Sequence, residues 1–175
     1  MRTAITALLA VRAALAAPAN ARRATCTELS TSSPNWQISN AASSDWPGGA
    51  SGRVELFARH APTGTLADCD VEYRLDADGK LVDYDPAAAV PCTNFGPAAL
   101  ATNVTLDMDT LLLSLTSTWT CGGEGEGGGT YTATGQTMLS RDTAPGACLV
   151  EPSQAGDATT CPIADVEVEG TLAVA

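Results

Sequence analysis

Apolar and polar residues alternate along most of this chain with a two-residue period, which places successive side chains on opposite faces of a β-strand. In the clearest example, Val71, Tyr73 and Leu75 share one face and the residues between them are charged. An Asp-Gly pair follows at 78–79, where a tight turn can use the positive φ that glycine tolerates. The alternation then resumes, so we predict a β-hairpin over residues 71–85.

A second two-sided pattern covers residues 104–121, either as two strands joined by a turn at Asp109-Thr110 or as one long bent strand. Gly170 interrupts another alternating segment and indicates a bulge or a close approach of the backbone. Further segments with the same alternation predict strands at 36–39, 53–60, 130–139 and 164–174.

Helix signals are weak and are restricted to short runs at 86–90 and 97–101. About seven to ten short strands separated by turn residues predict an all-β fold, a single antiparallel β-barrel or sandwich. The glycine-rich stretch at 122–129 contains two glutamates and no Lys-Ser/Thr pair, so we interpret it as a surface loop and not as a phosphate-binding loop.

The N-terminus has the features of an export signal. Arg2 precedes an apolar run, small residues follow at 14–16, and Arg22-Arg23 forms a dibasic pair. We predict a signal peptide at 1–17, a short pro-segment at 18–23 and a single secreted β domain at 24–175. The protein is therefore expected to be extracellular, and no later apolar run reaches the roughly 20 residues of a membrane span.

The cysteines predict that disulfides stabilise the fold. An even number in an exported chain is typical of a disulfide framework. We favour Cys69–Cys92 because the two residues flank one hairpin, and Cys148–Cys161 because they bracket one Pro/Gly/Thr-rich loop; Cys26–Cys121 then remains. All six cysteines lie after the predicted leader: Cys26, Cys69, Cys92, Cys121, Cys148 and Cys161.

Charge limits the class of partner. All 20 acidic residues follow residue 23, whereas four of the nine basic residues precede it, so residues 24–175 carry a formal net charge of −15. Such a chain is repelled by phosphate backbones and anionic lipids, so we expect neither nucleic-acid nor membrane partners.

Catalytic signatures are few. The single histidine, His60, ends a predicted strand, where we interpret it as a structural or surface residue and not as a general base. Acidic pairs are abundant, and a glycosidase-like pair of carboxylates is the alternative that they leave open. We expect a protein that is not an enzyme and uses no cofactor, with a small secreted hydrolase acting through acidic residues as the alternative.

Three other positions are candidate sites. Asp76 and Asp78 have the opening spacing of a calcium loop, but the following glycine comes too early, so we expect a solvated turn and no metal site. Trp46, in an expected loop at 43–52, is a candidate ligand-binding platform or, alternatively, the plug of a barrel end. Asn103 begins an Asn-Val-Thr sequon and is a candidate glycosylation site.

Several short motifs carry a family resemblance: the leader with its dibasic pair, Trp36-Gln37-Ile38, Trp119-Thr120-Cys121 and Thr132-Ala133-Thr134-Gly135. With these motifs and its cysteine spacing, the chain resembles small secreted cysteine-rich proteins of ascomycete fungi, especially the family around the Alternaria major allergen. The resemblance implies a β-barrel without an established catalytic centre. It also implies an allergen-like or effector role, and binding of small phenolic ligands or host proteins.

The resemblance further implies a Cys69–Cys92 bridge and a bridge from Cys121 to Cys148 or Cys161. A dimer through a free N-terminal cysteine is known in the family, whereas the even count here favours internal pairing of Cys26 and a monomer or weak dimer. The glycine-rich insertion and the charge of −15 depart from that family. The expected function is extracellular binding of a host or cell-wall component, whether a protein, a glycan or a small phenolic molecule.

Overall fold

The computed structural model describes residues 24–173 except 47, 49, 97–98, 123–128 and 154–155. The predicted signal peptide and pro-segment, and most of the glycine-rich stretch, lie outside the described residues. The described residues form one helix and thirteen strands: α1 (Cys26–Ser32), β1 (Trp36–Trp46), β2 (Ser51–His60), β3 (Leu66–Leu75), β4 (Leu81–Val82), β5 (Val90–Pro91), β6 (Thr93–Phe95), β7 (Leu100–Asp107), β8 (Leu112–Thr120), β9 (Thr130–Met138), β10 (Leu149–Ser153), β11 (Gly156–Ile163), β12 (Val166–Val168) and β13 (Thr171–Leu172).

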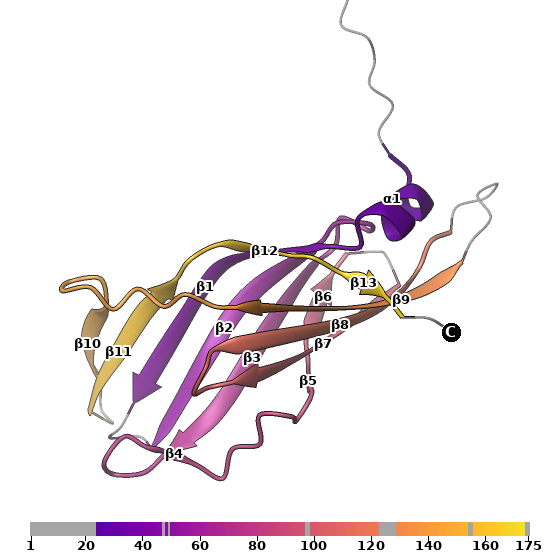
Figure 1. The fold of residues 1–175 in the computed structure, drawn as a ribbon. Coiled ribbons are helices and arrows are strands. Elements are labelled where there is room, and N and C mark those ends of the chain that lie inside the picture. Colours follow the sequence, from indigo (N-terminus) through magenta and orange to yellow (C-terminus); the bar gives the residue numbers. More distant parts are fainter. Residues whose placement is uncertain are drawn as a thin grey trace, which may run out of the picture.

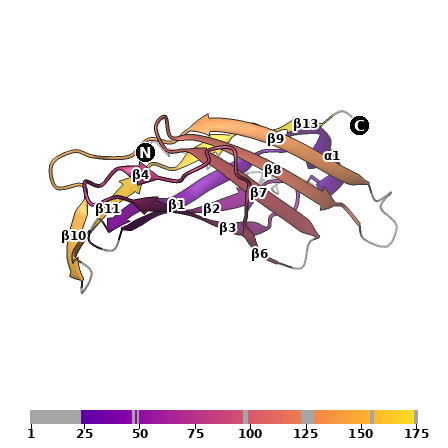
Figure 2. The ribbon, with the colours of Figure 1, turned by 90° about the horizontal axis from the view of Figure 1, so that it is seen from below.

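The strands form two antiparallel sheets that face each other, as Figures 1 and 2 show. The large sheet has the order β10-β11-β1-β2-β3-β4, with β12 beside β1 and β6 beside β3; the small sheet has the order β13-β9-β8-β7-β5. The all-β prediction is thus confirmed in its sandwich form, because the described strands close no barrel. The strand count exceeds the expected seven to ten because several strands have only two or three residues, too few to show an alternation.

The predicted hairpin at 71–85 is present. Strands β3 and β4 pair at Leu75 and Leu81, and the backbone N–H groups of Asp78 and Lys80 donate to the Asp76 carboxylate in the turn. Residues 104–121 fold as two strands, β7 and β8, with a turn between them, and not as one bent strand. In β3, β7 and β8 the alternating apolar positions are the buried ones, so the pattern identified their inner faces correctly, whereas both residues of β4 are half-buried.

The sequence predictions for two helices and two strands need correction. Residues 97–101 and 86–90 form no helix where they are described; Leu100 begins β7 and Val90 begins β5. The first strand does not end at residue 39 but continues to Trp46 after a bulge, at which Asn40 has φ = 50°. The segment at 164–174 is broken at Gly170, where an added Cβ would lie 1.8 Å from the Pro34 carbonyl oxygen, in keeping with the predicted close approach.

Helix α1 was not predicted, although its start is encoded locally. Thr25 and Glu28 form a capping box, in which the Thr25 hydroxyl accepts from the Glu28 N–H and the Glu28 carboxylate accepts from the Thr25 N–H. The helix is fixed to the small sheet by the Cys26–Cys121 disulfide. Ser30, buried on its inner face, accepts a hydrogen bond from the Trp119 indole.

All six cysteines are paired, as Cys26–Cys121, Cys69–Cys92 and Cys148–Cys161. These are the pairs favoured from hairpin and loop positions. The family resemblance implied a different partner for Cys121 and is wrong on that point, because α1 lies over the end of β8 and brings Cys26 to it. The Cys69–Cys92 bridge links β3 to the segment between β5 and β6.

The space between the sheets holds one hydrophobic core. Its end nearest α1 is filled by aromatic rings: Trp36 from β1, Trp119 from β8, and His60 between them with ring centroids 5.7 and 4.4 Å away. The Trp36 indole donates to Ser117 of the small sheet, whose hydroxyl also pairs with Thr102. Buried polar groups at this end are therefore linked across the two sheets, which fixes how the sheets are aligned.

Candidate functional site

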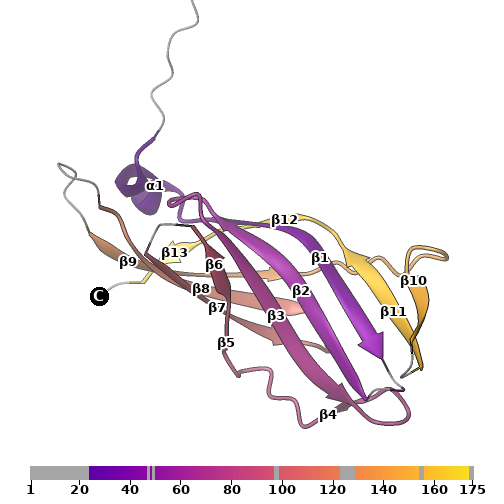
Figure 3. The ribbon, with the colours of Figure 1, turned by 180° about the vertical axis from the view of Figure 1, so that it is seen from behind.

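The outer side of the large sheet, in front in Figure 3, carries two hollows near opposite ends of β1 and β2. The first has a volume of about 470 Å³ and surrounds Trp46, the last residue of β1. Trp46 is therefore in a strand and not in the expected loop. Its indole is half-buried and lies in one row with the exposed Ser51 and Arg74, so it covers the outer side of the large sheet and does not plug the end of the sandwich.

Cross-strand register assembles the hollow around Trp46. Trp46 pairs with Ser51 of β2, and Ser51 pairs with Arg74 of β3, so these three residues form one row across the sheet. Arg53 and Glu72 form the next row and line the same hollow. Apart from Trp46, this group could not be recognised in the sequence, because its members come from three strands and meet only through strand pairing.

The guanidinium carbon of Arg53 lies 5.7 Å from the centroid of the Trp46 ring, a cation–π contact. Arg53 also forms ion pairs with Glu55 at 3.2 Å and with Asp70 at 3.9 Å, which hold its side chain along the sheet. Arg74 is far more exposed, and its ion pair with the exposed carboxylate of Asp83 is long, at 3.9 Å. The hollow thus has one anchored and one loosely held cation beside an aromatic ring.

Gly52 and Tyr73 lie at the floor of the hollow, and the Tyr73 side chain points away from it, into the space between the sheets. They are direct partners across β2 and β3, and the Tyr73 ring occupies the position of a side chain at residue 52, 2.2 Å from where a Cβ would lie. The Tyr73 hydroxyl donates to the Asp45 carboxylate. The pKa of Tyr73 is raised, mainly because the phenol is buried and also because the Asp45 carboxylate accepts its hydrogen bond. The phenol therefore stays protonated and is held in place by that hydrogen bond.

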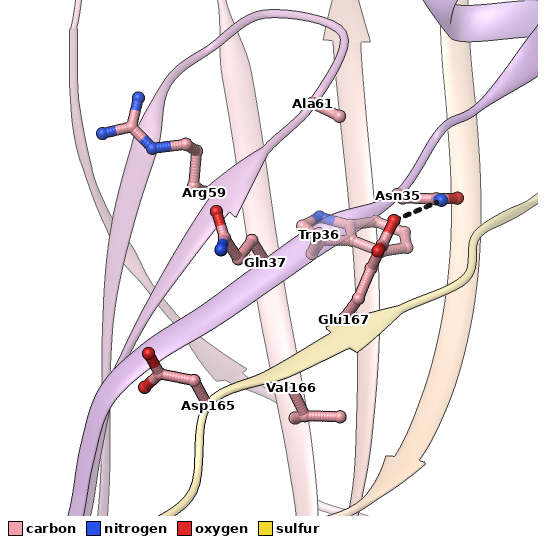
Figure 4. A pocket seen from close by; sticks show the side chains of 8 residues that line it. All are labelled: Asn35, Trp36, Gln37, Arg59, Ala61, Asp165, Val166 and Glu167. Carbon is pink, nitrogen blue, oxygen red and sulfur yellow. Dashed lines mark hydrogen bonds between the residues drawn. The ribbon is translucent and has the colours of Figure 1, made fainter.

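The second hollow, about 390 Å³, runs over the start of β1 (Figure 4). Arg59 of β2 borders it on one side, and Asp165 and Glu167, beside and within β12, border it on the other. The Asn35 side-chain amide donates to Glu167 at 3.0 Å. Trp36 lies beneath this second hollow but is only 1% exposed, so it offers a ligand little aromatic surface.

His60 lies in neither hollow. Its side chain is fully buried between Trp36 and Trp119; Nδ1 is 3.0 Å from the Thr63 hydroxyl, and Nε2 has no hydrogen-bond partner. Burial lowers the pKa of the imidazole to about 4. Of the two predicted alternatives, a structural or a surface residue, burial excludes the surface one and places His60 in the core.

The metal candidates form part of a turn. One carboxylate oxygen of Asp76 accepts hydrogen bonds from the backbone N–H groups of Asp78 and Lys80 within the turn. Asp78 is exposed and precedes Gly79, whose φ is +76°. Within the described ranges, no group of three or more His, Cys, Asp or Glu side chains is arranged to hold a metal ion. Of the carboxylates on β3, Glu72 is exposed, Asp68 and Asp70 are half-buried, and Asp70 forms an ion pair with Arg53.

The glycosylation candidate, Asn103, lies within β7 on the outer side of the small sheet. Its side chain is half-buried, and it pairs with Pro91 of β5 on one side and Thr116 of β8 on the other. The Asn103 side chain can therefore be reached from solvent only from the sheet face and not from an exposed loop.

No helix in the described part of the chain is long and apolar enough to cross a membrane. Searches against models of known families, curated proteins and solved structures found no match to the chain. The family resemblance noted from short motifs therefore has no support beyond those motifs, and the function has to be argued from the site itself.

Proposed function

We propose that the protein is an exported binding protein, without catalytic activity, that takes a small phenolic molecule in the hollow around Trp46. The observation that supports this most directly is the row of Trp46, Ser51 and Arg74 above the Gly52–Tyr73 floor. The volume of about 470 Å³ lies within the usual range for small-molecule sites. Export is supported by the leader-like N-terminus and by three disulfides, which persist in oxidising compartments.

The lining chemistry suits a phenol better than a highly charged ligand. A phenolic ring can stack against the half-exposed indole of Trp46, an arrangement that contributes about 1 kcal/mol beyond area burial. Its hydroxyls would then meet an acceptor in Glu72 and a donor in Arg74, both exposed at the rim. Since these two carry opposite charges, the rim favours a polar ligand of low net charge.

A hydrolase remains the second candidate, and the groove in Figure 4 is where it would act, because Asp165 and Glu167 line it. Glycosidases place their two carboxylates on opposite sides of the scissile bond. Here both carboxylates come from the same short segment, and the facing side carries Arg59 and Gln37. This arrangement favours binding over hydrolysis.

Tryptophan fluorescence tests the proposed site directly. Trp36 and Trp119 are each 1% exposed, so Trp46 is the tryptophan that an added phenol can reach and quench. Titration with one- and two-ring phenols should quench the emission saturably, and calorimetry should give the same dissociation constant. Trp46→Leu should weaken the calorimetric affinity at least tenfold, which corresponds to about 1.4 kcal/mol.

Arg74→Gln should weaken binding, while the matched variant Arg59→Gln, in the other hollow, should leave it unchanged. Equal affinity in the wild type and Trp46→Leu would refute the site. To test the alternative function, chromogenic glycosides should be assayed with the wild type and with Asp165→Asn. Turnover that disappears in Asp165→Asn would establish the hydrolase instead.

A further inference from the structure

The outer side of the small sheet, in front in Figure 1, carries a regular array of threonines. Strand β8 places a threonine at each of its last three outward positions, and β9 at each of its first three. The pairing Thr116–Thr134, Thr118–Thr132 and Thr120–Thr130 sets these residues in three cross-strand rows. We call them the hydroxyl face: Thr116, Thr118, Thr120, Thr130, Thr132 and Thr134.

The hydroxyl face contrasts in charge with the rest of the molecule. Neither β8 nor β9 contains a charged residue, whereas β2 and β3 together contain seven acidic or basic residues. Threonine is common in β-strands, which explains its presence on an exposed sheet. That preference does not explain why the outer positions of β8 and β9 have no charged residue. In a chain with 20 acidic residues, an uncharged sheet face favours an uncharged partner.

The hydrogen-bonding capacity of the face identifies the chemistry of that partner. Thr118 and Thr132 share one hydrogen bond of 2.9 Å, and Thr120 and Thr130 share one of 3.3 Å. Each hydroxyl offers one donor and two lone pairs, so every pair keeps a free donor and several free acceptors toward solvent. Five of the six threonines are exposed, and the sixth, Thr132, is half-buried.

The geometry of the face favours a polymer. Hydroxyls recur about every 6.6 Å along each strand and about every 4.8 Å between strands. One end of the face continues into a hollow of about 500 Å³, bordered by Thr116, Thr134, Gln136 and Thr171, with the exposed carboxylate of Glu169 at its far edge as the one charged group that lines it. A sugar residue seated in this hollow would leave the rest of its chain to run along the three rows.

We propose that the hydroxyl face binds an uncharged polysaccharide, such as a neutral glucan, a mannan or chitin. Such chains present many hydroxyls and no charge, and therefore match both the donors and the neutrality of the face. This surface lies on the opposite sheet from the hollow around Trp46 and is independent of the proposed phenol site. Because Asn103 pairs with Thr116, a glycan attached to that sequon would compete for the same surface.

Cosedimentation with insoluble β-glucan, cellulose and chitin, and retention on a mannan gel, test the proposal, with polygalacturonate as the anionic control. All proteins carry Asn103→Gln, so that an attached glycan does not cover the face. We expect binding to at least one neutral polymer and none to polygalacturonate. Binding should persist at high salt, because no ion pair contributes to it.

The double variant Thr116→Val/Thr134→Val keeps the shape of both side chains and removes their hydroxyls, and it should weaken binding at least tenfold. Its matched control is Thr93→Val/Thr143→Val, at two exposed threonines outside the hydroxyl face, which should bind as before. Urea unfolding confirms that each variant is folded. No binding to any neutral polymer, loss of binding at high salt, or equal binding by the two double variants would overturn the proposal. Trp46→Leu should have no effect, which separates this result from that for the phenol site.

Discussion

Acid should destabilise the protein through its single histidine. The His60 ring is fully buried between Trp36 and Trp119, and in the imidazolium form its Nε2–H would have no acceptor. The Thr63 hydroxyl is the only side-chain group in the described structure that is hydrogen-bonded to the ring, and it is neutral. Contact with the aromatic rings favours a cation only modestly, so the loss of hydration dominates and lowers the pKa of His60 to about 4.

The sign of the effect follows from where the proton binds. Above about pH 6.5 the imidazole is neutral in both the folded and the unfolded chain, so the histidine makes no pH-dependent contribution. Between pH 6.5 and 4 the unfolded chain binds a proton that the folded chain does not. The free energy of unfolding therefore decreases as the pH is lowered. With a folded pKa of about 4, the loss should reach about 3 kcal/mol at pH 4.

Urea denaturation of the wild type and of His60→Leu, measured from pH 7 to pH 4, isolates this term. The 20 acidic residues titrate in both proteins, so their contribution cancels in the difference between the two. That difference should shift by about 3 kcal/mol in favour of the leucine variant as the pH falls. NMR adds a direct check, because the Cε1 proton of the only histidine needs no assignment. A titration midpoint near 6.5, or parallel pH profiles for the two proteins, would refute the argument.

Three further substitutions test the packing. Gly170→Ala should destabilise by roughly 3 kcal/mol, because its Cβ would overlap a backbone carbonyl oxygen, and the loss should appear as a lower urea midpoint. Ser30→Ala should lower the free energy of unfolding by about 1–3 kcal/mol in the same assay, because it leaves the buried indole N–H of Trp119 without its acceptor. Its control, Ser32→Ala at an exposed position of α1, should change the stability little. Cys26→Ser/Cys121→Ser opens a bridge across 95 residues and should cost about 4 kcal/mol, with unchanged stability in urea as the contradicting outcome.

The local features of the fold could be predicted from the sequence. Alternation identified the inner faces of β3 and β8 because a strand exposes its two faces in turn, and an Asp-Gly pair located the turn before β4. The capping box at Thr25 and Glu28 was an equally local signal that would have located α1. The bulge at Asn40, by contrast, shifts the alternation by one position and conceals the second half of β1.

The candidate sites depend on information that a single segment does not contain. Trp46 and Arg74 are 28 residues apart, and they share a row only because β2 lies between β1 and β3 in one particular register. A shift of that register by one residue would place Arg74 opposite an inward-facing position and abolish the hollow. The threonines of β8 and β9 were likewise visible as two separate runs, but a surface exists only once the strands pair.

The two sheets divide the surface of the protein by charge, and this division supports two separate binding functions. The large sheet presents both signs of charge around Trp46, where polar groups can orient a small ligand. Strands β8 and β9 of the small sheet present neutral hydroxyls, which have little preference for one orientation but gain from repetition along a polymer. The Trp36–Ser117 hydrogen bond and the rings around His60 hold the two sheets together. Acid that weakens these contacts should therefore abolish binding at both surfaces together. Loss of phenol binding and of polysaccharide binding in the same pH range, with His60→Leu retaining both, would be the combined signature of that arrangement.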